Sequence, residues 1–289
     1  MTLEIQTHVP NRDLCGEGPL WDTATNTLVW VDIERGLGFT YDPASGDLSS
    51  KDYGVPLVFT MPTRSGNGVL VGKHHTIEHV DASGNVTVLA TINDGNDDLR
   101  VQDAKCDKQG RLVFGSFSKT RKLNTGALYS LDPSGELTVL KPVLSLANGL
   151  DWSPNGEKFY HVDSDMQNIE VYDYDQSTGA ISNGRVFCSI PLWEGLPDGM
   201  AVDTEGGVWV ALFGGKAVRR YDENGKISEH LEMPTTNVTS CIFGGQDLQT
   251  MFVTSAALWL PEGVQEETAG ALFECRPGAT GTVTHPFGI

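Results

Sequence analysis

A short phrase recurs along this 289-residue sequence and constrains the fold more than any other feature. Each copy is a turn rich in Gly, Asp and Asn, followed by a short run of β-branched or aromatic residues. The six copies begin at Asp22, Ser65, Asp107, Ser153, Asp203 and Gln246. Their spacing, roughly 40 to 50 residues, is typical of one blade of a β-propeller. The repeat therefore predicts six blades.

A second family of turns alternates with the first. Its members begin at Asp42, Asp81, Asp132, Asp175, Asp222 and Arg276. Each follows an aromatic or apolar stretch and precedes an alternating one, so each repeat holds two hairpins, or four antiparallel strands. Helical periodicity is absent, and Leu258–Thr268, which contains Pro261 and Gly263, is predicted to be a loop. We therefore predict an all-β, six-bladed β-propeller with four-stranded antiparallel blades, a design that leaves only short sheet edges.

The predicted propeller accounts for the whole chain. No Pro/Ser-rich linker or change of composition divides the sequence, so we expect residues 1–289 to form a single β-propeller domain. The ring must still be closed. Leu3–Val9 alternates as a strand does, and we expect it to complete the last blade.

Composition excludes several classes of partner. With 20 basic and 38 acidic residues the net charge is −18, which would repel nucleic acid and anionic membranes. No apolar run approaches the roughly 18 residues of a membrane span, and the start, Met-Thr-Leu-Glu-Ile-Gln, does not resemble a signal peptide. We expect a cytoplasmic protein, a monomer or weak dimer, whose five scattered cysteines are reduced.

Polar residues that precede the predicted inner strands are the candidates for a functional site. They are Glu17, the pair Arg100 and Gln102, Asn148 and Asp198. Asn-Gly and Asp-Gly are also ordinary turn dipeptides, so each residue alone is weak evidence. Four of them nevertheless lie four to six residues before a blade turn: Glu17, Gln102, Asn148 and Asp198. Equivalent positions in different blades of a propeller point toward one axis, so these side chains are expected to converge.

The side chains of Glu17, Asn148 and Asp198 offer only oxygen ligands. Oxygen ligands suit a hard divalent cation such as calcium, magnesium or manganese better than a thiolate-type zinc site. Two carboxylates and one amide would leave coordination positions for water and substrate, as in a catalytic metal site. We predict one axial divalent cation; calcium, manganese, zinc and magnesium all stay open.

Longer phrases carry a resemblance to a known family. They include Gly16-Glu-Gly-Pro19, Asn148-Gly-Leu-Asp-Trp-Ser153, Phe159-Tyr-His-Val-Asp-Ser164, Pro197-Asp-Gly-Met200 and Thr239-Ser-Cys-Ile-Phe-Gly-Gly245. In this order, along nearly the whole chain, they resemble the regucalcin/gluconolactonase family (senescence-marker-protein, luciferin-regenerating enzyme-like). The resemblance implies a six-bladed propeller with one axial divalent metal and lactone hydrolysis. It also implies that Glu17, Asn148 and Asp198 are the metal ligands and that Arg100 contacts the substrate.

The sequence departs from the family pattern at two places. Where the family usually has Asn-Arg-x-Asn-Asp, this chain has Leu99-Arg-Val-Gln-Asp103, so Gln102 replaces an asparagine next to the metal. Lys119 stands near the position where animal members carry an acidic substrate-binding residue. We expect Arg100, Gln102 and Lys119 to contact the substrate, and the two replacements to alter its identity.

Other polar residues have structural explanations. His74, His75 and His79 resemble a metal cluster, but we expect them on an alternating outer strand, where His74 and His75 would face opposite sides. Ser240 and Ser255 lack the G-x-S-x-G context of a serine hydrolase.

Two carboxylates and several aromatic residues are also assigned roles outside the metal site. Asp103 and Asp163 are expected to cap turns rather than to contact substrate. The aromatic residues are assigned to two environments: Trp21, Trp152 and Trp209 to the core between blades, Trp193 or Phe213 to a pocket wall.

The predicted activity is metal-assisted hydrolysis of a small lactone, with a sugar aldonolactone as the expected substrate. Asp198 would serve as a metal ligand and as the base that takes a proton from the attacking water, and Arg100 would orient substrate oxygens. Two other functions fit the same residues. The propeller could bind a metal or ligand without turnover, or it could hydrolyse aryl esters or phosphotriesters.

Overall fold

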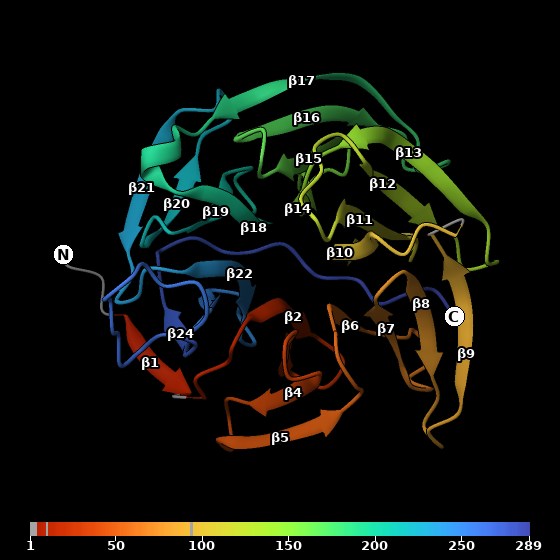
Figure 1. Cartoon of the computed structure of the whole chain (residues 1–289), viewed down its shortest axis with the longest axis horizontal. Helices are drawn as coiled ribbons and strands as arrows, with labels where there is room; N and C mark the ends of the chain where they lie inside the picture. Colours follow the sequence, from red (N-terminus) through yellow and green to blue (C-terminus); the bar gives the residue numbers. More distant parts are fainter. Residues whose placement is uncertain (1–4, 10, 93–94) are drawn as a thin grey trace.

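Six four-stranded antiparallel sheets surround a central axis in the computed structural model, which describes residues 5–9, 11–92 and 95–289 (Figure 1). Five of the sheets are simple meanders, with the first strand at the axis and the last at the periphery, and in the sixth the outermost strand is β1 (Gln6–Val9), from the start of the described chain. This arrangement is the predicted six-bladed propeller.

The blades follow one another along the chain. Blade 1 contains β2 (Gly16–Asp22), β3 (Thr27–Asp32), β4 (Leu37–Asp42) and β5 (Asp47–Asp52), and blade 2 contains β6 (Phe59–Pro62), β7 (Val69–Lys73), β8 (Thr76–Val80) and β9 (Val86–Thr91). Blade 3 contains β10 (Leu99–Cys106), β11 (Leu112–Ser118), β12 (Gly126–Leu131) and β13 (Leu137–Leu144).

The second half of the ring has the same plan. Blade 4 contains β14 (Ala147–Trp152), β15 (Lys158–Asp163), β16 (Asn168–Tyr174) and β17 (Ile181–Ser189). A short 3-10 helix, η1 (Leu192–Glu194), leads into blade 5, which contains β18 (Leu196–Val202), β19 (Val208–Phe213), β20 (Ala217–Tyr221) and β21 (Ile227–Glu232). Blade 6 contains β22 (Val238–Gly244), β23 (Thr250–Ser255), β24 (Leu272–Cys275) and β1 (Gln6–Val9).

The recurring phrase is the hairpin that joins the inner strand of a blade to its second strand. In blade 5, Asp203 explains why an acidic residue begins it. Its Oδ1 accepts the backbone N–H of Glu205 (3.0 Å) and Gly207 (2.8 Å), and its Oδ2 accepts the indole N–H of Trp209 (2.8 Å). The carboxylate thus satisfies the turn and anchors a fully buried tryptophan of the next strand.

The N-terminal strand closes the ring, and the C-terminal segment crosses it. β1 pairs antiparallel with β24, which confirms the predicted closure for residues 6–9; Leu3 and Glu4 lie outside the described residues. After β24 the chain does not form an outer strand, although the repeat pattern continues at Arg276. It crosses one mouth of the propeller instead (dark blue in Figure 1), pairing Gly281 with Asp203 and His285 with Cys106.

Aromatic side chains fill the spaces between blades. Trp21 and Trp209 are buried in one cluster that blades 1, 5 and 6 share, and Trp21 stacks on Phe252 with ring centroids 5.9 Å apart. Trp152 packs at the edge of the cluster between blades 3 and 4 but is only partly buried. The core prediction is therefore confirmed for Trp21 and Trp209 and holds in part for Trp152.

The structure also bears on several smaller predictions. Leu258–Thr268 contains neither helix nor strand. The five cysteines, all within the described residues, are free thiols. Within the described ranges, no helix has the length and apolar character needed to cross a membrane.

Candidate metal centre and active site

A β-bulge interrupts the inner strand of five blades near its start. The register shifts between Glu17 and Leu20 in β2, and at equivalent places in β10, β14, β18 and β22. A bulge leaves residues outside the ladder and re-aims their side chains, which is why bulges are frequent beside active sites. Gln102, Asn148 and Asp198 lie within these bulges, and Glu17 begins one.

The glycines that follow Asn148 and Asp198 allow neighbouring blades to approach at the axis. A Cβ atom at Gly149 would lie 2.4 Å from the carbonyl oxygen of Asp198, and one at Gly199 would lie 1.9 Å from Oγ of Ser240. Neither glycine has a positive φ, and both belong to strands. The interpretation of Asn-Gly and Asp-Gly as turn dipeptides is therefore wrong.

The side chain of Asn148 is buried and held in one orientation. Its Nδ2 donates to Oγ of Ser164 (2.9 Å), which in turn donates to the carbonyl oxygen of Pro197 (2.6 Å). Ser164 has one hydroxyl proton, which it donates to Pro197, so it can only accept a hydrogen bond from Asn148. The amide nitrogen of Asn148 therefore faces Ser164, and its Oδ1 faces other groups. Ser164 is a positioning residue that the sequence did not reveal.

Gln102 links Asn148 to Arg100. Its Nε2 donates to Oδ1 of Asn148 (2.8 Å), and its Oε1 accepts from Nη2 of Arg100 (3.0 Å). The guanidinium of Arg100 lies 4.7 Å from the ring centroid of Phe117, and its buried Nε has no hydrogen-bond partner among the described residues. Arg100, Gln102 and Asn148 therefore form a continuous polar relay across blades 3 and 4.

The two carboxylates of the predicted ligand set are buried and repel each other. Burial, with repulsion from Asp103, raises the pKa of Glu17 to about 8. Burial, with repulsion from Glu17 and then Asp103, raises the pKa of Asp198 well above its usual range. Oδ1 of Asp198 is also buried without a hydrogen-bond partner in the described structure. Such a pair is poorly satisfied by the protein alone.

These features fit a bound cation. A divalent ion would neutralise Glu17 and Asp198 and would satisfy the orphaned Oδ1, while the relay presents an amide oxygen from Asn148. Within the described residues, no group of three or more His, Cys, Asp or Glu side chains is placed to hold a metal. A cation at this mouth would therefore depend on the neutral ligand Asn148.

Asp103 differs from the expectation that it caps a turn. Burial raises its pKa to about 6, and the nearby Lys105 ammonium acts in the opposite direction. Its Oδ1 accepts the adjacent N–H of Ala104 (2.7 Å), and its negative charge raises the pKa of both Glu17 and Asp198. Asp163 does behave as predicted, because its two oxygens accept the N–H groups of Ser145 and Leu146 at the entry to β14.

Lys119 and His74 lie near the same mouth. Lys119 is exposed in the loop after β11, where its N–H donates to the carbonyl of Asp98 (2.8 Å). His74 is not on a strand. It occupies the turn between β7 and β8 with φ +45°, and burial, followed by the charge of Lys119, lowers its pKa.

The histidine prediction is therefore partly wrong. His74 and His75 form the two-residue hairpin turn, a geometry that the short phrase Lys73-His-His-Thr76 could have suggested, and the carbonyl of His74 accepts the N–H of Val101 (2.6 Å) beside Arg100. His79 does lie on a strand, β8, well away from the axis. Its Nε2 is 2.7 Å from the carbonyl oxygen of Asn67.

The two proposed pocket-wall aromatics lie at the end of blade 5 where β18 begins. Trp193 is 85% exposed on η1. Phe213 is partly buried at the end of β19, where its ring faces Trp259 at 6.3 Å. Phe213 also packs against the apolar cluster that contains Cys15, and the pocket-wall role of both aromatics stays a prediction.

Fold and site together define a class: a six-bladed propeller whose inner-strand bulges gather carboxylate, amide and guanidinium groups at one mouth of the axis. The sequence of residues 15–257 matches the family described as SMP-30/Gluconolactonase/LRE-like region. The chain belongs to this family.

Relatives of the chain match it over nearly its full length. Regucalcin from Bos taurus is 34% identical over 284 residues, 94% of each chain. A Bacillus subtilis (strain 168) protein with the provisional name of a sugar lactone lactonase is 33% identical over 279 residues, 96% of each. The crystal structure of regucalcin from Agrobacterium tumefaciens, described as a calcium-binding protein, is 25% identical with a TM-score of 0.93, and the match covers 100% of this chain and 99% of that one.

Proposed function

We propose that this protein is a divalent-cation-dependent lactonase that hydrolyses a small lactone, with a sugar aldonolactone as the preferred substrate class. The observation that carries the proposal is the buried, mutually repelling pair Glu17 and Asp198, with the amide of Asn148 fixed beside them. Membership of a family named for gluconolactonase supports lactone chemistry, as does the name of the Bacillus relative.

Glu17, Asn148 and Asp198 would hold one cation. The oxygen ligands favour calcium, magnesium or manganese, zinc is the other cation to be tested, and the description of the Agrobacterium protein as calcium-binding supports calcium. When bound, the cation supplies Lewis acidity toward the lactone carbonyl. The protein's part is to hold the ligands rigidly, which the bulges and the bond from Asn148 to Ser164 accomplish.

Asp198 is the proposed base. One of its carboxylate oxygens would face the cation, and the other would accept a proton from the attacking water, provided that the carboxylate is ionised. Among the described residues, Oδ1 has no hydrogen-bond partner. Without a cation the raised pKa favours the protonated form of this group, and a positive charge beside it would lower the pKa.

Arg100 would position the substrate. Its Nη2 is held by Gln102, whereas its Nε has no hydrogen-bond partner among the described residues and would donate to a lactone or hydroxyl oxygen. The product is a carboxylate, so the positive charges of Arg100 and the exposed Lys119 favour the developing anion. Gln102 and Lys119 would thereby set the choice among lactones.

One observation supports a second function, cation or ligand binding without turnover. Gln102 Nε2 donates to Oδ1 of Asn148, the atom that would face the cation, and so competes for one of its lone pairs. A site occupied in this way could bind a ligand and yet hold no productive water.

A substrate panel separates these functions. The protein is first chelated, then assayed on D-glucono-1,5-lactone, dihydrocoumarin and the phosphotriester paraoxon, with calcium, manganese, zinc or magnesium added singly. We expect cation-restored turnover with the aldonolactone above the other two. Preference for dihydrocoumarin or paraoxon would replace the lactonase proposal by the aryl-ester or phosphotriester function, and cation binding without any turnover would favour the binding protein.

A further inference from the structure

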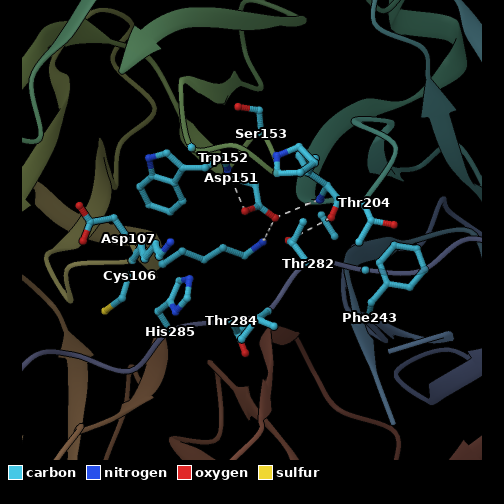
Figure 2. A pocket seen from close by; sticks show the side chains of 18 of the residues that line it. Cys106, Asp107, Asp151, Trp152, Ser153, Thr204, Phe243, Thr282, Thr284 and His285 are labelled. Carbon is cyan, nitrogen blue, oxygen red and sulfur yellow. Dashed lines mark hydrogen bonds and ion pairs between the residues drawn. The ribbon is translucent and has the colours of Figure 1, made fainter. Parts of the chain in front are cut away.

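A cavity of about 580 Å³ opens at the other mouth of the propeller (Figure 2). It is lined by the far ends of inner strands, including Leu20, Lys105 and Asp151, and by the blade turns that follow them. The candidate metal centre uses the near ends of the same strands, so the two sites lie at opposite ends of the axis. The crossing segment 280–285 supplies the remaining wall.

Two of the charged residues that line this cavity, Lys105 and Asp151, form an ion pair that is already satisfied. Lys105 Nζ lies 2.8 Å from Oδ2 of Asp151 and donates to the carbonyl of Met200 at the same distance. The Asp151 carboxylate also accepts the N–H groups of Val202 (3.0 Å) and Trp152 (2.8 Å). Figure 2 shows Asp151 at the centre of these bonds. The pair offers one remaining ammonium hydrogen and an oxygen lone pair, but no net charge.

The other charged groups that line the cavity are paired or at its rim. Asp107 binds Arg111 (2.7 Å) and the hydroxyl of Tyr174 (2.7 Å). Burial lowers the pKa of His285, so its imidazole is neutral at pH 7. Lys108 is exposed to solvent. An ion inside the cavity would therefore lack a counter-charge among the described residues, and its desolvation would be uncompensated.

The walls combine apolar surfaces with neutral hydrogen-bonding groups. Leu20 and Val283 contribute apolar groups, and the partly buried Trp152 contributes an aromatic face. Ser153 and Thr204 contribute hydroxyls from the blade turns and appear with Trp152 and Phe243 around the opening in Figure 2. Small-molecule sites typically have this composition, mostly apolar with a few polar groups that fix orientation, and volumes of about 300–1,000 Å³.

We propose that this cavity is a second small-molecule site, for an uncharged ligand that joins an aromatic ring to a hydroxylated ring, as aryl glycosides do. The aromatic part packs on Trp152, and the hydroxyls bond the Lys105–Asp151 pair and the turn side chains. The inference does not rest on the proposed lactonase activity, because it uses none of the residues assigned to that reaction.

The test uses phenyl β-D-glucopyranoside as the probe and isothermal titration calorimetry on the full chain. Thr204→Trp fills the opening from the blade 5 turn. Thr23→Trp is the matched control, since Thr23 is exposed at the same position of the blade 1 turn and does not line the cavity. Glu17→Gln alters the opposite mouth. Phenyl β-D-glucuronide, which carries a carboxylate on an otherwise similar frame, tests the preference for a neutral ligand.

We expect the wild type, T23W and E17Q to bind the glucoside with affinities within about twofold of one another, and T204W to bind at least tenfold more weakly. The glucuronide should bind the wild type at least tenfold more weakly than the glucoside. Undiminished binding by T204W, binding lost in E17Q instead, preference for the glucuronide, or no binding of the glucoside by the wild type would each overturn the proposal. Circular dichroism spectra identify any variant that has not folded, and Val283→Trp then replaces T204W, because Val283 is exposed and also lines the cavity.

Discussion

Gln102 and Asn148 are joined side chain to side chain, with Nε2 of the first donating to Oδ1 of the second over 2.8 Å. The bond spans blades 3 and 4 at the axis and continues on one side to Arg100 and on the other to Ser164. The position of a neutral ligand in the candidate metal centre therefore depends on a residue that departs from the family pattern.

Gln102→Met keeps the length of this side chain and removes both hydrogen bonds. We expect kcat/KM for the aldonolactone to fall on the order of tenfold, the effect of about 1.4 kcal/mol, because Arg100 and Asn148 lose a shared partner. Steady-state kinetics at saturating cation measure it, with circular dichroism confirming the fold. Unchanged kcat/KM would show that the relay does not position the site.

Ser164→Ala leaves the amide of Asn148 and the carbonyl of Pro197 without a shared partner. Both groups are buried, so we expect the free energy of unfolding to fall by about 1–3 kcal/mol. Urea denaturation measures the change. Ser177→Ala is the control in the same blade, because that hydroxyl bonds Asp175 on the exposed surface and its loss should cost far less. Equal losses in the two variants would contradict this role for Ser164.

Gly199→Ala tests the close approach of blades 5 and 6. The added Cβ would lie 1.9 Å from Oγ and 2.4 Å from Cβ of Ser240, so a backbone shift is required, and overpacking of this kind costs about 1–3 kcal/mol or more. Adding Ser240→Gly removes both contacts and should restore part of the loss. Thermal unfolding of the single and double variants measures the two stabilities. If the double variant is no more stable than Gly199→Ala alone, the strain does not come from the contact with Ser240.

Asp13 gives the cation-free protein a pH-dependent stability. Burial raises its pKa to about 7, although Trp30 Nε1 donates to Oδ2 (2.8 Å). The folded chain thus binds this proton more tightly than the unfolded chain, whose Asp titrates near pH 4. The free energy of unfolding should therefore decrease as pH rises from about 4 to about 7, by at most about 1.4 kcal/mol per pH unit for one proton.

Asp13→Asn keeps an acceptor for Trp30 and removes the titration. Urea denaturation of the chelated protein at several pH values should show a shallower fall in the variant over this window. Glu17 and Asp103, with raised pKa values of about 8 and 6, contribute a fall of the same sign in both proteins. Identical slopes would mean that Asp13 is ionised in the folded state throughout.

The architecture could be predicted from the sequence because the turns of each blade are encoded by neighbouring residues. Turns such as the one begun by Asp203 repeat their hydrogen bonds within a few residues, so their pattern is visible without tertiary information. The outer strand of blade 6 was also predictable from alternation in the first residues, whereas the crossing of segment 281–287 was not. Its contacts are with residues of blades 2, 3 and 5, far away in the chain.

The candidate site was predictable only in part, for a similar reason. Glu17, Asn148 and Asp198 precede glycines, and this short-range signal marked them. The Asn-Gly and Asp-Gly pairs were interpreted as turns. In the structure, glycine is needed at positions 149 and 199 because residues of the neighbouring blade lie too close for a side chain. Ser164 and His74 reach the site through long-range packing, and Asp103 acquires its raised pKa from burial; a linear pattern records none of these.

The cation dependence of lactone hydrolysis by wild type and Asp198→Ala tests the central claim most directly. Chelated protein is titrated with calcium while both calcium binding and the rate on D-glucono-1,5-lactone are followed. We predict that wild-type activity returns in step with one bound cation, and that the variant loses both the binding and the turnover. An Asp198→Ala protein that hydrolyses the lactone at an undiminished rate would contradict the account.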